Sequence, residues 1–166
     1  MGRTCPVLKT GLNSACHGRD VSALLETTGL LVSRQAVVSI IDDDTSIRRA
    51  IKRLIESADL AVAEFGSAEE FLVSGCSQNS VCLILDLQLP GMSGLELQNQ
   101  LRISNPRLPI IFVSAAANEN AIEHALRAGA IQFLEKPFNE QALFAAISNS
   151  LLLFHSHRDL NRLRNG

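Results

Sequence analysis

The sequence predicts a doubly wound α/β domain over about residues 36–154, in which five strands alternate with five helices. Three observations lead to this prediction. Short apolar runs recur along the stretch, and the segments between them have the apolar spacing of amphipathic helices. Most of these segments also begin or end with a helix-capping residue. Such alternation is typical of a parallel sheet covered by helices on both faces.

The predicted strands are apolar runs of strand length, four of them strong and one weak. A run that is apolar on both faces suits a strand buried between two layers of helices. The four strong runs, followed by the weak one, are Val37–Ile41, Val81–Leu85, Ile110–Val113, Ile131–Leu134 and Leu60–Phe65.

The predicted helices are marked by apolar stripes and by caps. In the first helix the stripe consists of Ile47, Ala50, Ile51, Leu54, Ile55 and Ala58, with most of the basic residues outside it. Two capping boxes, which open the second and third helices, are Ser67 with Glu70 and Ser93 with Glu96. Gly129 is placed where the fourth helix should end, and Asn139 is a suitable cap for the fifth.

Composition and charge indicate a globular body with an acidic surface. Of the 166 residues, 46% are hydrophobic and 19% are charged, which is enough for a substantial core. Residues 36–154 hold 8 basic and 14 acidic residues, a net charge of −6, and the two ends are slightly basic. An acidic body is a poor surface for nucleic acid, so direct DNA binding is not expected.

The four cysteines, Cys5, Cys16, Cys76 and Cys82, form no CxxC pair. Cys82 lies inside an apolar run and is expected to be a buried free thiol, whereas Cys16 beside His17 lacks the further ligands of a metal site. A reducing cytoplasm is therefore the expected compartment. No apolar stretch reaches the length of a membrane span, and residues 1–35 lack the pattern of a signal peptide.

Polar groups capable of chemistry follow each of the four strong runs. The first run leads into Asp42, Asp43 and Asp44, and the others lead into Asp86, Ser114 and Lys136. Taken singly, each has an ordinary explanation, and Asp44 is a natural cap for the first helix. Together they matter more, because the carboxyl ends of parallel strands meet at one edge of a sheet, where ligands of doubly wound folds bind.

The chemistry of this set favours phosphoryl transfer. Clustered carboxylates require a cation, and ligands that offer only oxygen favour Mg²⁺. A carboxylate can attack phosphorus to form an aspartyl-phosphate. Metal, ammonium and hydroxyl would each neutralise or hydrogen-bond one oxygen of the transferred group.

At these residues the sequence resembles the receiver domains of two-component response regulators, across roughly residues 36–150. The segments that carry the resemblance are SIIDDDTSIRRAI, LILDLQLPGMSGLEL, IIFVSA and AGAIQFLEKPF. The stretch DLQLPGMSG is highly specific, and SAEEFL and FLEKPF favour the branch of nitrogen-fixation and LuxR-type regulators. The resemblance implies a flavodoxin-like (βα)5 fold with strand order 2-1-3-4-5.

The resemblance also implies a role for each acidic residue. Asp86 is the expected phosphoacceptor. Asp43 and Asp86 are expected to bind Mg²⁺ directly, Asp42 to hold a metal-bound water, and the backbone carbonyl of Gln88 to complete the protein's ligands.

Other residues match the switching parts of the family. Ser114 is the expected switch hydroxyl, Lys136 the partner of the phosphoryl group, and Phe133 the aromatic that turns inward when the site is loaded; otherwise Phe133 is an ordinary core aromatic. The resemblance implies a cis peptide at Lys136–Pro137. The small Ala115 is expected to leave the acceptor open to a donor.

Three regions are expected: a flexible extension at 1–35, the receiver domain at 36–154, and a short tail at 155–166. Relatives of this branch carry a DNA-binding helix-turn-helix domain after the receiver, and a dozen residues are too few to form one. The expected partner is a sensor histidine kinase, recognised around Ile47–Ile55. The apolar run Leu151–Phe154 either docks against the body or forms a homodimer contact.

Two other functions fit part of the pattern. Haloacid-dehalogenase-type phosphatases use a DxDx[ST] motif with a later hydroxyl and lysine, and the residues in that order are Asp42, Asp44, Ser46, Ser114 and Lys136. They also need an acidic pair after the lysine, which is lacking here, and they leave DLQLPGMSG unexplained. A receiver-like interaction module that is never phosphorylated is the other alternative. The preferred prediction is a phosphoacceptor signalling domain and not an enzyme.

Overall fold

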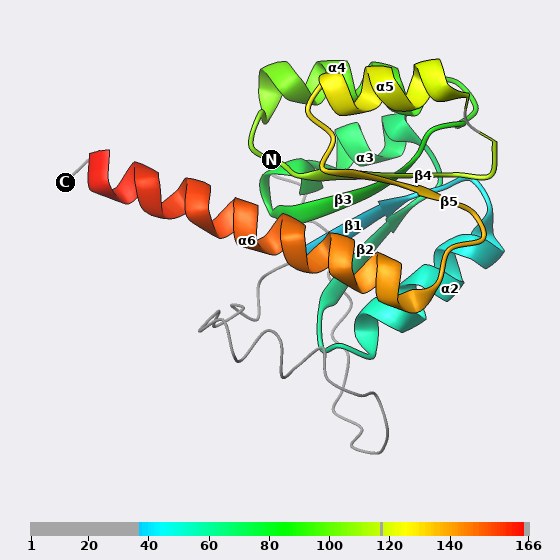
Figure 1. Ribbon diagram of the computed structural model, residues 1–166, viewed down its shortest axis with the longest axis horizontal. Helices are drawn as coiled ribbons and strands as arrows, with labels where there is room; N and C mark the ends of the chain where they lie inside the picture. Colours follow the sequence, from blue (N-terminus) through cyan, green and yellow to red (C-terminus); the bar gives the residue numbers. More distant parts are fainter. Residues whose placement is uncertain (1–36, 117, 165–166) are drawn as a thin grey trace.

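Five strands pair in one parallel sheet with the order β2-β1-β3-β4-β5, which confirms the predicted doubly wound, flavodoxin-like fold. The computed structural model describes residues 37–116 and 118–164, with side chains as far as residue 156 (Figure 1). The expected extension at 1–35 therefore lies outside the described residues. The elements are, in chain order, β1 (Val37–Ile41), α2 (Thr45–Glu56), β2 (Ala61–Phe65), α3 (Ala68–Ser74), the 3₁₀ turn η1 (Cys76–Gln78), β3 (Ser80–Asp86), α4 (Gly94–Ser104), β4 (Ile110–Ser114), α5 (Glu119–Arg127), β5 (Gln132–Glu135) and α6 (Glu140–Arg164).

Helices cover both faces of the sheet. Figure 1 shows α3, α4 and α5 on one face, with α2 and α6 on the other. In β1, Val37 and Ile41 belong to the core under α3, α4 and α5, while Val38 and Ile40 belong to the core under α2 and α6. All five residues of β1 are buried, as expected for a strand whose two faces both pack against helices.

Of the two predicted capping boxes, one is complete and the other is not. In α4, Ser93 and Glu96 form the full reciprocal box. In α3, the Ser67 hydroxyl accepts a hydrogen bond from Glu70 N at 3.1 Å, but the Glu70 carboxylate accepts from Gly66 N at 2.7 Å. The predicted return contact of that box is therefore wrong by one residue, because the Glu70 carboxylate reaches past Ser67.

The buried face of α2 is narrower than the apolar stripe predicted for it. Ile51 and Ile55 are buried, but Ala50 is exposed. The helix ends at Glu56, and Ala58 is buried in the turn that follows. The prediction for Ala50 is wrong, because the face of α2 that packs against the sheet is centred on Ile51 and Ile55.

Helix α6 is the longest element. Asn139 accepts a hydrogen bond from Ala142 N at 2.7 Å, as a cap of its first turn should. The helix continues for 25 residues to Arg164, so residues 155–164 of the expected tail are helical. Within the described part of the chain, no helix combines the length and the hydrophobicity needed to cross a lipid bilayer.

The apolar run near the middle of α6 is divided between core and surface. Leu151 is fully buried against the sheet, whereas Leu152 and Leu153 are 42% and 40% exposed. Docking against the body thus accounts for Leu151. A homodimer contact through Leu152 and Leu153 stays a prediction.

Cys82 is a free, buried thiol, as predicted from its apolar run. Burial raises its pKa to about 12, although the Ser150 hydroxyl partly offsets this effect. The neutral thiol therefore persists far above pH 8, and thiolate, the reactive form, is scarce. Iodoacetamide at pH 8 should leave Cys82 unmodified in the folded protein and label it after denaturation. Fragment-ion mass spectrometry that separates Cys82 from Cys76 would check this, and rapid labelling of folded protein would contradict it.

Candidate functional site

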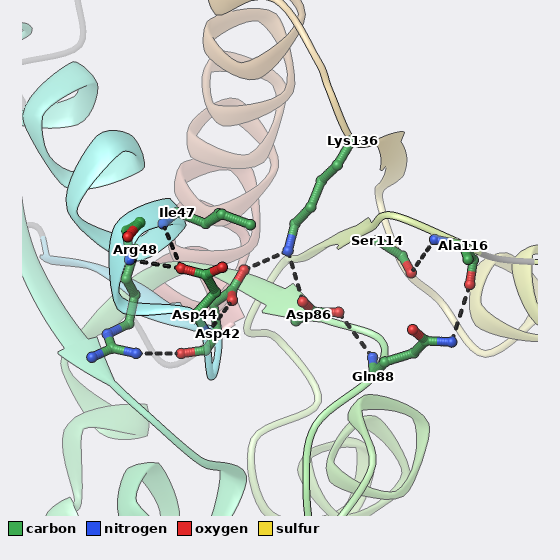
Figure 2. A network of polar contacts seen from close by, with 10 residues as sticks. Asp42, Asp44, Ile47, Arg48, Asp86, Gln88, Ser114, Ala116 and Lys136 are labelled. Carbon is green, nitrogen blue, oxygen red and sulfur yellow. Dashed lines mark hydrogen bonds and ion pairs between the residues drawn. The ribbon is translucent and has the colours of Figure 1, made fainter.

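The parallel register brings the predicted site residues to one edge of the sheet. Ile41 at the end of β1 pairs with Leu85, and Asp86 at the end of β3 pairs with Val113. Ser114, at the end of β4, pairs with Glu135. Asp42, Asp86 and Lys136 therefore lie at neighbouring strand ends. Figure 2 shows these three side chains directed toward one another.

Three carboxylates form an acidic cluster at this edge. Asp42, Asp43 and Asp86 each offer an oxygen, and these atoms lie within 4.8 Å of one another. Asp42 is fully buried and Asp86 is 6% exposed, whereas Asp43 lies open to solvent. The cluster is therefore anchored in the protein on one side and accessible on the other.

Lys136 bridges the two buried carboxylates. Its Nζ lies 2.6 Å from Asp42 Oδ2 and 2.7 Å from Asp86 Oδ2. Burial alone would lower the pKa of Lys136, but hydrogen bonds to the two carboxylates outweigh this effect and raise it. The ammonium is therefore charged at neutral pH.

The pKa of Asp42 is also raised, although Lys136 pulls in the other direction. Burial of its carboxylate is the larger cause, and the hydrogen bond from Lys136 opposes it. Lys136 is shared between two carboxylates, so its hydrogen bond to Asp42 does not fully offset the effect of burial on the pKa of Asp42. Three carboxylates and one ammonium leave an excess of negative charge. Oxygen-only donors with this excess fit a hard divalent cation such as Mg²⁺.

The loop after β1 is held by its neighbours. Asp44 N donates to Asp42 Oδ1 at 2.9 Å, and the Asp44 carboxylate caps α2 by accepting from Ser46 N and Ile47 N. The cap role predicted for Asp44 is thus confirmed. Arg48 donates from its guanidinium to the Asp42 carbonyl at 2.6 Å (Figure 2).

Arg48 was missed as a site residue because its place outside the apolar stripe suggested a solvated side chain. It is half-buried, and it fixes the backbone that precedes Asp43. Its spacing one turn after the Asp44 cap is the sequence signal that could have placed it near the strand end.

The loop after β3 is tied to β4 by Gln88. Its N–H donates to Asp86 Oδ1 at 2.9 Å, and its side-chain Nε2 donates to the Ala116 carbonyl at 3.2 Å. Ala116 N in turn donates to the Ser114 hydroxyl at 3.4 Å. Ser114 is buried and lies on the opposite side of Asp86 from Asp42 (Figure 2). Among the described residues, no carboxylate forms a hydrogen bond with this hydroxyl.

The remaining predicted residues lie around this edge. Phe133 is half-buried, and its ring stacks on Phe112 with centroids 6.4 Å apart and planes 18° from parallel. The peptide between Lys136 and Pro137 is cis, as the resemblance implied. Ala115 is exposed directly after Ser114.

Removing the ammonium from this edge should weaken the fold. In Lys136→Met, Asp42 and Asp86 lose the positive charge between them, and we expect unfolding free energy to fall by about 2 kcal/mol without divalent ions. Breaking a buried ion pair usually costs about 3–5 kcal/mol. The loss is smaller here because burial has already raised the pKa of Asp42, which can take up a proton. Urea denaturation followed by circular dichroism measures the change.

The control is Lys52→Met, which breaks the ion pair with Glu64. That pair is 23% and 24% exposed, so its loss should cost only about 0–1 kcal/mol. Mg²⁺ should stabilise Lys136→Met more than the parent, because the ion replaces the missing charge. Equal stability of Lys136→Met and the parent without Mg²⁺ would contradict the prediction.

The sequence profile of the response regulator receiver domain family matches residues 38–148. Nodulation protein W of Bradyrhizobium diazoefficiens is 41% identical over 115 residues, 69% of this chain and 51% of that protein. Response regulator protein TodT of Pseudomonas putida strain F1 is 39% identical over 133 residues, 79% of this chain and 59% of that protein. The chain thus spans only about half the length of these relatives.

Solved structures have the same fold. A low-resolution structure of the response regulator StyR is 39% identical, with a TM-score of 0.72, over 78% of this chain and 66% of that one. A CheY-like receiver domain protein of Methanospirillum hungatei is 27% identical, with a TM-score of 0.68, over 74% of this chain and 98% of that one.

Proposed function

Because the chain belongs to the response regulator receiver domain family, we propose that it is a phosphoacceptor switch whose acceptor is Asp86. The observation that carries the proposal is the bridge that Lys136 forms between Asp42 and Asp86, next to Asp43. This arrangement puts a nucleophilic carboxylate, a cation for the phosphoryl oxygens and an acidic cluster at one accessible edge. The family is one of signalling domains, and we propose no enzymatic turnover beyond self-phosphorylation and self-dephosphorylation.

In the proposed reaction, a carboxylate oxygen of Asp86 attacks phosphorus in line with the bond to the donor. The new P–O bond forms as the donor's bond breaks, and the leaving group departs with that electron pair. Lys136 neutralises one of the phosphoryl oxygens. Its contact with Asp86 already places the ammonium within reach of the new group.

Mg²⁺ would be held by Asp43, Asp86 and the Gln88 carbonyl, with Asp42 on a bound water, and would supply charge neutralisation for the phosphoryl oxygens. The Gln88 N–H holds Asp86 Oδ1 at 2.9 Å, and so orients the acceptor carboxylate. Arg48 and Asp44 similarly hold the backbone and carboxylate of Asp42.

The proposed switch involves Ser114 and Phe133. A phosphoryl dianion on Asp86 would attract the Ser114 hydroxyl away from Ala116 N, a weak contact of 3.4 Å. The space released at the end of β4 would let Phe133 change its packing on Phe112. The phosphoryl group would thus shift the equilibrium between two packings of Ser114 and Phe133.

The proposed partner is a sensor histidine kinase that recognises α2, around Ile47–Ile55. The proposed compartment is the cytoplasm. Direct DNA binding by the receiver body is not proposed, since residues 36–154 carry a net charge of −6. The division into extension, receiver and tail is likewise kept as a proposal.

The phosphatase alternative is less well supported by the site. Its motif includes Asp44, but the Asp44 carboxylate caps α2 through Ser46 N and Ile47 N. Asp42, its nucleophile, is fully buried and paired with Lys136. We therefore keep the phosphoacceptor proposal.

The test is incubation with acetyl phosphate, with and without Mg²⁺, followed by intact mass measurement. We expect one labile phosphoryl group per chain that appears only with Mg²⁺. Steady release of phosphate from a generic phosphoester would instead support the phosphatase. The absence of any Mg²⁺-dependent modification would support an interaction module that is never phosphorylated.

A further inference from the structure

Glu69, in the first turn of α3, contacts a loop that is distant in sequence. Its Oε1 accepts a hydrogen bond from the backbone N–H of Met92 at 2.8 Å. The carboxylate is exposed, yet this hydrogen bond is the largest cause of a lowered pKa of Glu69. The contact joins α3 to the connection between β3 and α4.

The close approach at Gly91 supports the same contact. Gly91 has a φ of +79°, and a Cβ on it would lie 2.7 Å from Glu69 Oε1. The loop backbone and the carboxylate therefore touch over two successive residues. Glycine permits this approach, because any side chain would displace the carboxylate.

The loop in question leads from the acceptor to α4. Its first residue is fixed by Leu87 N, which donates to the Val113 carbonyl at 3.1 Å. Its last residue is fixed by Ser93 N, which donates to Glu96 Oε2 at 2.8 Å. Met92 N is held from outside, by a helix that belongs to neither end of the loop. Gln88 lies between the two ends.

We propose that Glu69 is a positioning residue for the metal site: by holding Met92 N, it fixes the loop whose Gln88 carbonyl serves as a ligand. This inference rests on the proposed function for the role of Gln88. Groups that hydrogen-bond the partners of a metal orient them and tune affinity. Glu69 acts one step further away, through the loop backbone, and so couples the start of α3 to the site.

A simpler role for Glu69 is to stabilise the N-terminus of α3 through its negative charge, whichever group the carboxylate contacts. Glu70 distinguishes the two roles. It lies in the same first turn of α3, carries the same charge, and accepts from Gly66 N at 2.7 Å and not from the loop. Glu70→Ala therefore removes an equal charge from the same turn and leaves the Met92 contact intact.

The experiment measures Mg²⁺ binding to Glu69→Ala, Glu69→Gln and Glu70→Ala by titration calorimetry, since the chain has no Trp or Tyr to report by emission. We expect Glu69→Ala to weaken Mg²⁺ affinity roughly 3- to 10-fold, less than the 10- to 100-fold typical of groups that bond a ligand directly. Glu69→Gln should restore affinity to within about twofold, because its amide oxygen still accepts the hydrogen bond. Glu70→Ala should bind as the parent does.

Amide hydrogen exchange of Met92, followed by NMR, gives a second measurement without Mg²⁺. Exchange should quicken in Glu69→Ala and not in Glu70→Ala. Equal Mg²⁺ affinity of Glu69→Ala and the parent, or an equal loss in Glu70→Ala, would overturn the inference. A parent that binds Mg²⁺ with this dependence on Glu69, but takes up no phosphoryl group, would instead overturn the phosphoacceptor proposal alone.

Discussion

Asp86→Asn is expected to abolish Mg²⁺-dependent phosphorylation by acetyl phosphate. The substitution replaces the nucleophilic carboxylate with an amide that cannot form a stable acyl phosphate, so the yield should fall by several orders of magnitude. The fold should persist, because the amide oxygen can still accept the hydrogen bond from Gln88 N. Intact mass measurement after incubation with acetyl phosphate detects the loss.

The control for Asp86→Asn is circular dichroism of the same sample. Loss of one of three clustered carboxylates removes repulsion but also breaks the ion pair with Lys136, which keeps its pair with Asp42, so the variant should remain folded. Phosphorylation of Asp86→Asn at the parent's level would mean that another group, such as Asp43, is the acceptor. That outcome would contradict the assignment of Asp86.

Gly94→Ala is expected to give the largest loss of stability among Gly→Ala substitutions in the described part of the chain. The new Cβ would lie 2.4 Å from the Asp86 carbonyl oxygen and 3.1 Å from Leu87 Cα. Both neighbours are backbone atoms of the buried strand end, so they cannot move aside cheaply. Overpacking usually costs about 1–3 kcal/mol, and we expect about 3 kcal/mol here. Urea denaturation of the variant and the parent measures the difference.

Gly66→Ala is the matched control for Gly94→Ala. A Cβ at Gly66 would make ordinary contacts, with its nearest neighbour, Glu70 Oε2, at 3.6 Å. We expect a change within about 0.5 kcal/mol, as for substitutions without a specific defect. Similar stabilities of Gly94→Ala and Gly66→Ala would show that the start of α4 can shift, contrary to the prediction.

The fold could be predicted because each strand carries its own signal. Residues such as those of Val37–Ile41 are apolar on both faces, and that pattern requires helices on both sides of the sheet. The predicted bounds of the last strand, Ile131–Leu134, differ by one residue from the observed strand, which is Gln132–Glu135. Ile131 N donates to the Ile110 carbonyl at 2.8 Å, so it lies beside the sheet just before the strand begins.

The centre of the candidate site could be predicted for a similar reason. Asp42, Asp86 and Lys136 follow strands directly, and parallel pairing fixes where strand ends meet. Arg48 and Glu69 could not be found in the same way. Their partners, the Asp42 carbonyl and Met92 N, are backbone groups that depend on how helices and loops approach one another in space. The spacing of Arg48 from the Asp44 cap indicates that it lies near the strand end, but not which backbone group it contacts.

The length of α6 has a mechanical consequence. The helix begins four residues after Lys136 and continues for 25 residues, which corresponds to about 37 Å of rise. Figure 1 shows its far half extending away from the sheet. Because Leu151 is buried against the sheet, the part of the helix that can act as a lever runs from residue 152 to 164, which corresponds to about 20 Å of rise, and a tilt of about 5° at Leu151 would move its tip through about 2 Å. Small changes in the packing of Leu151 would therefore produce larger displacements of the distal turns of α6.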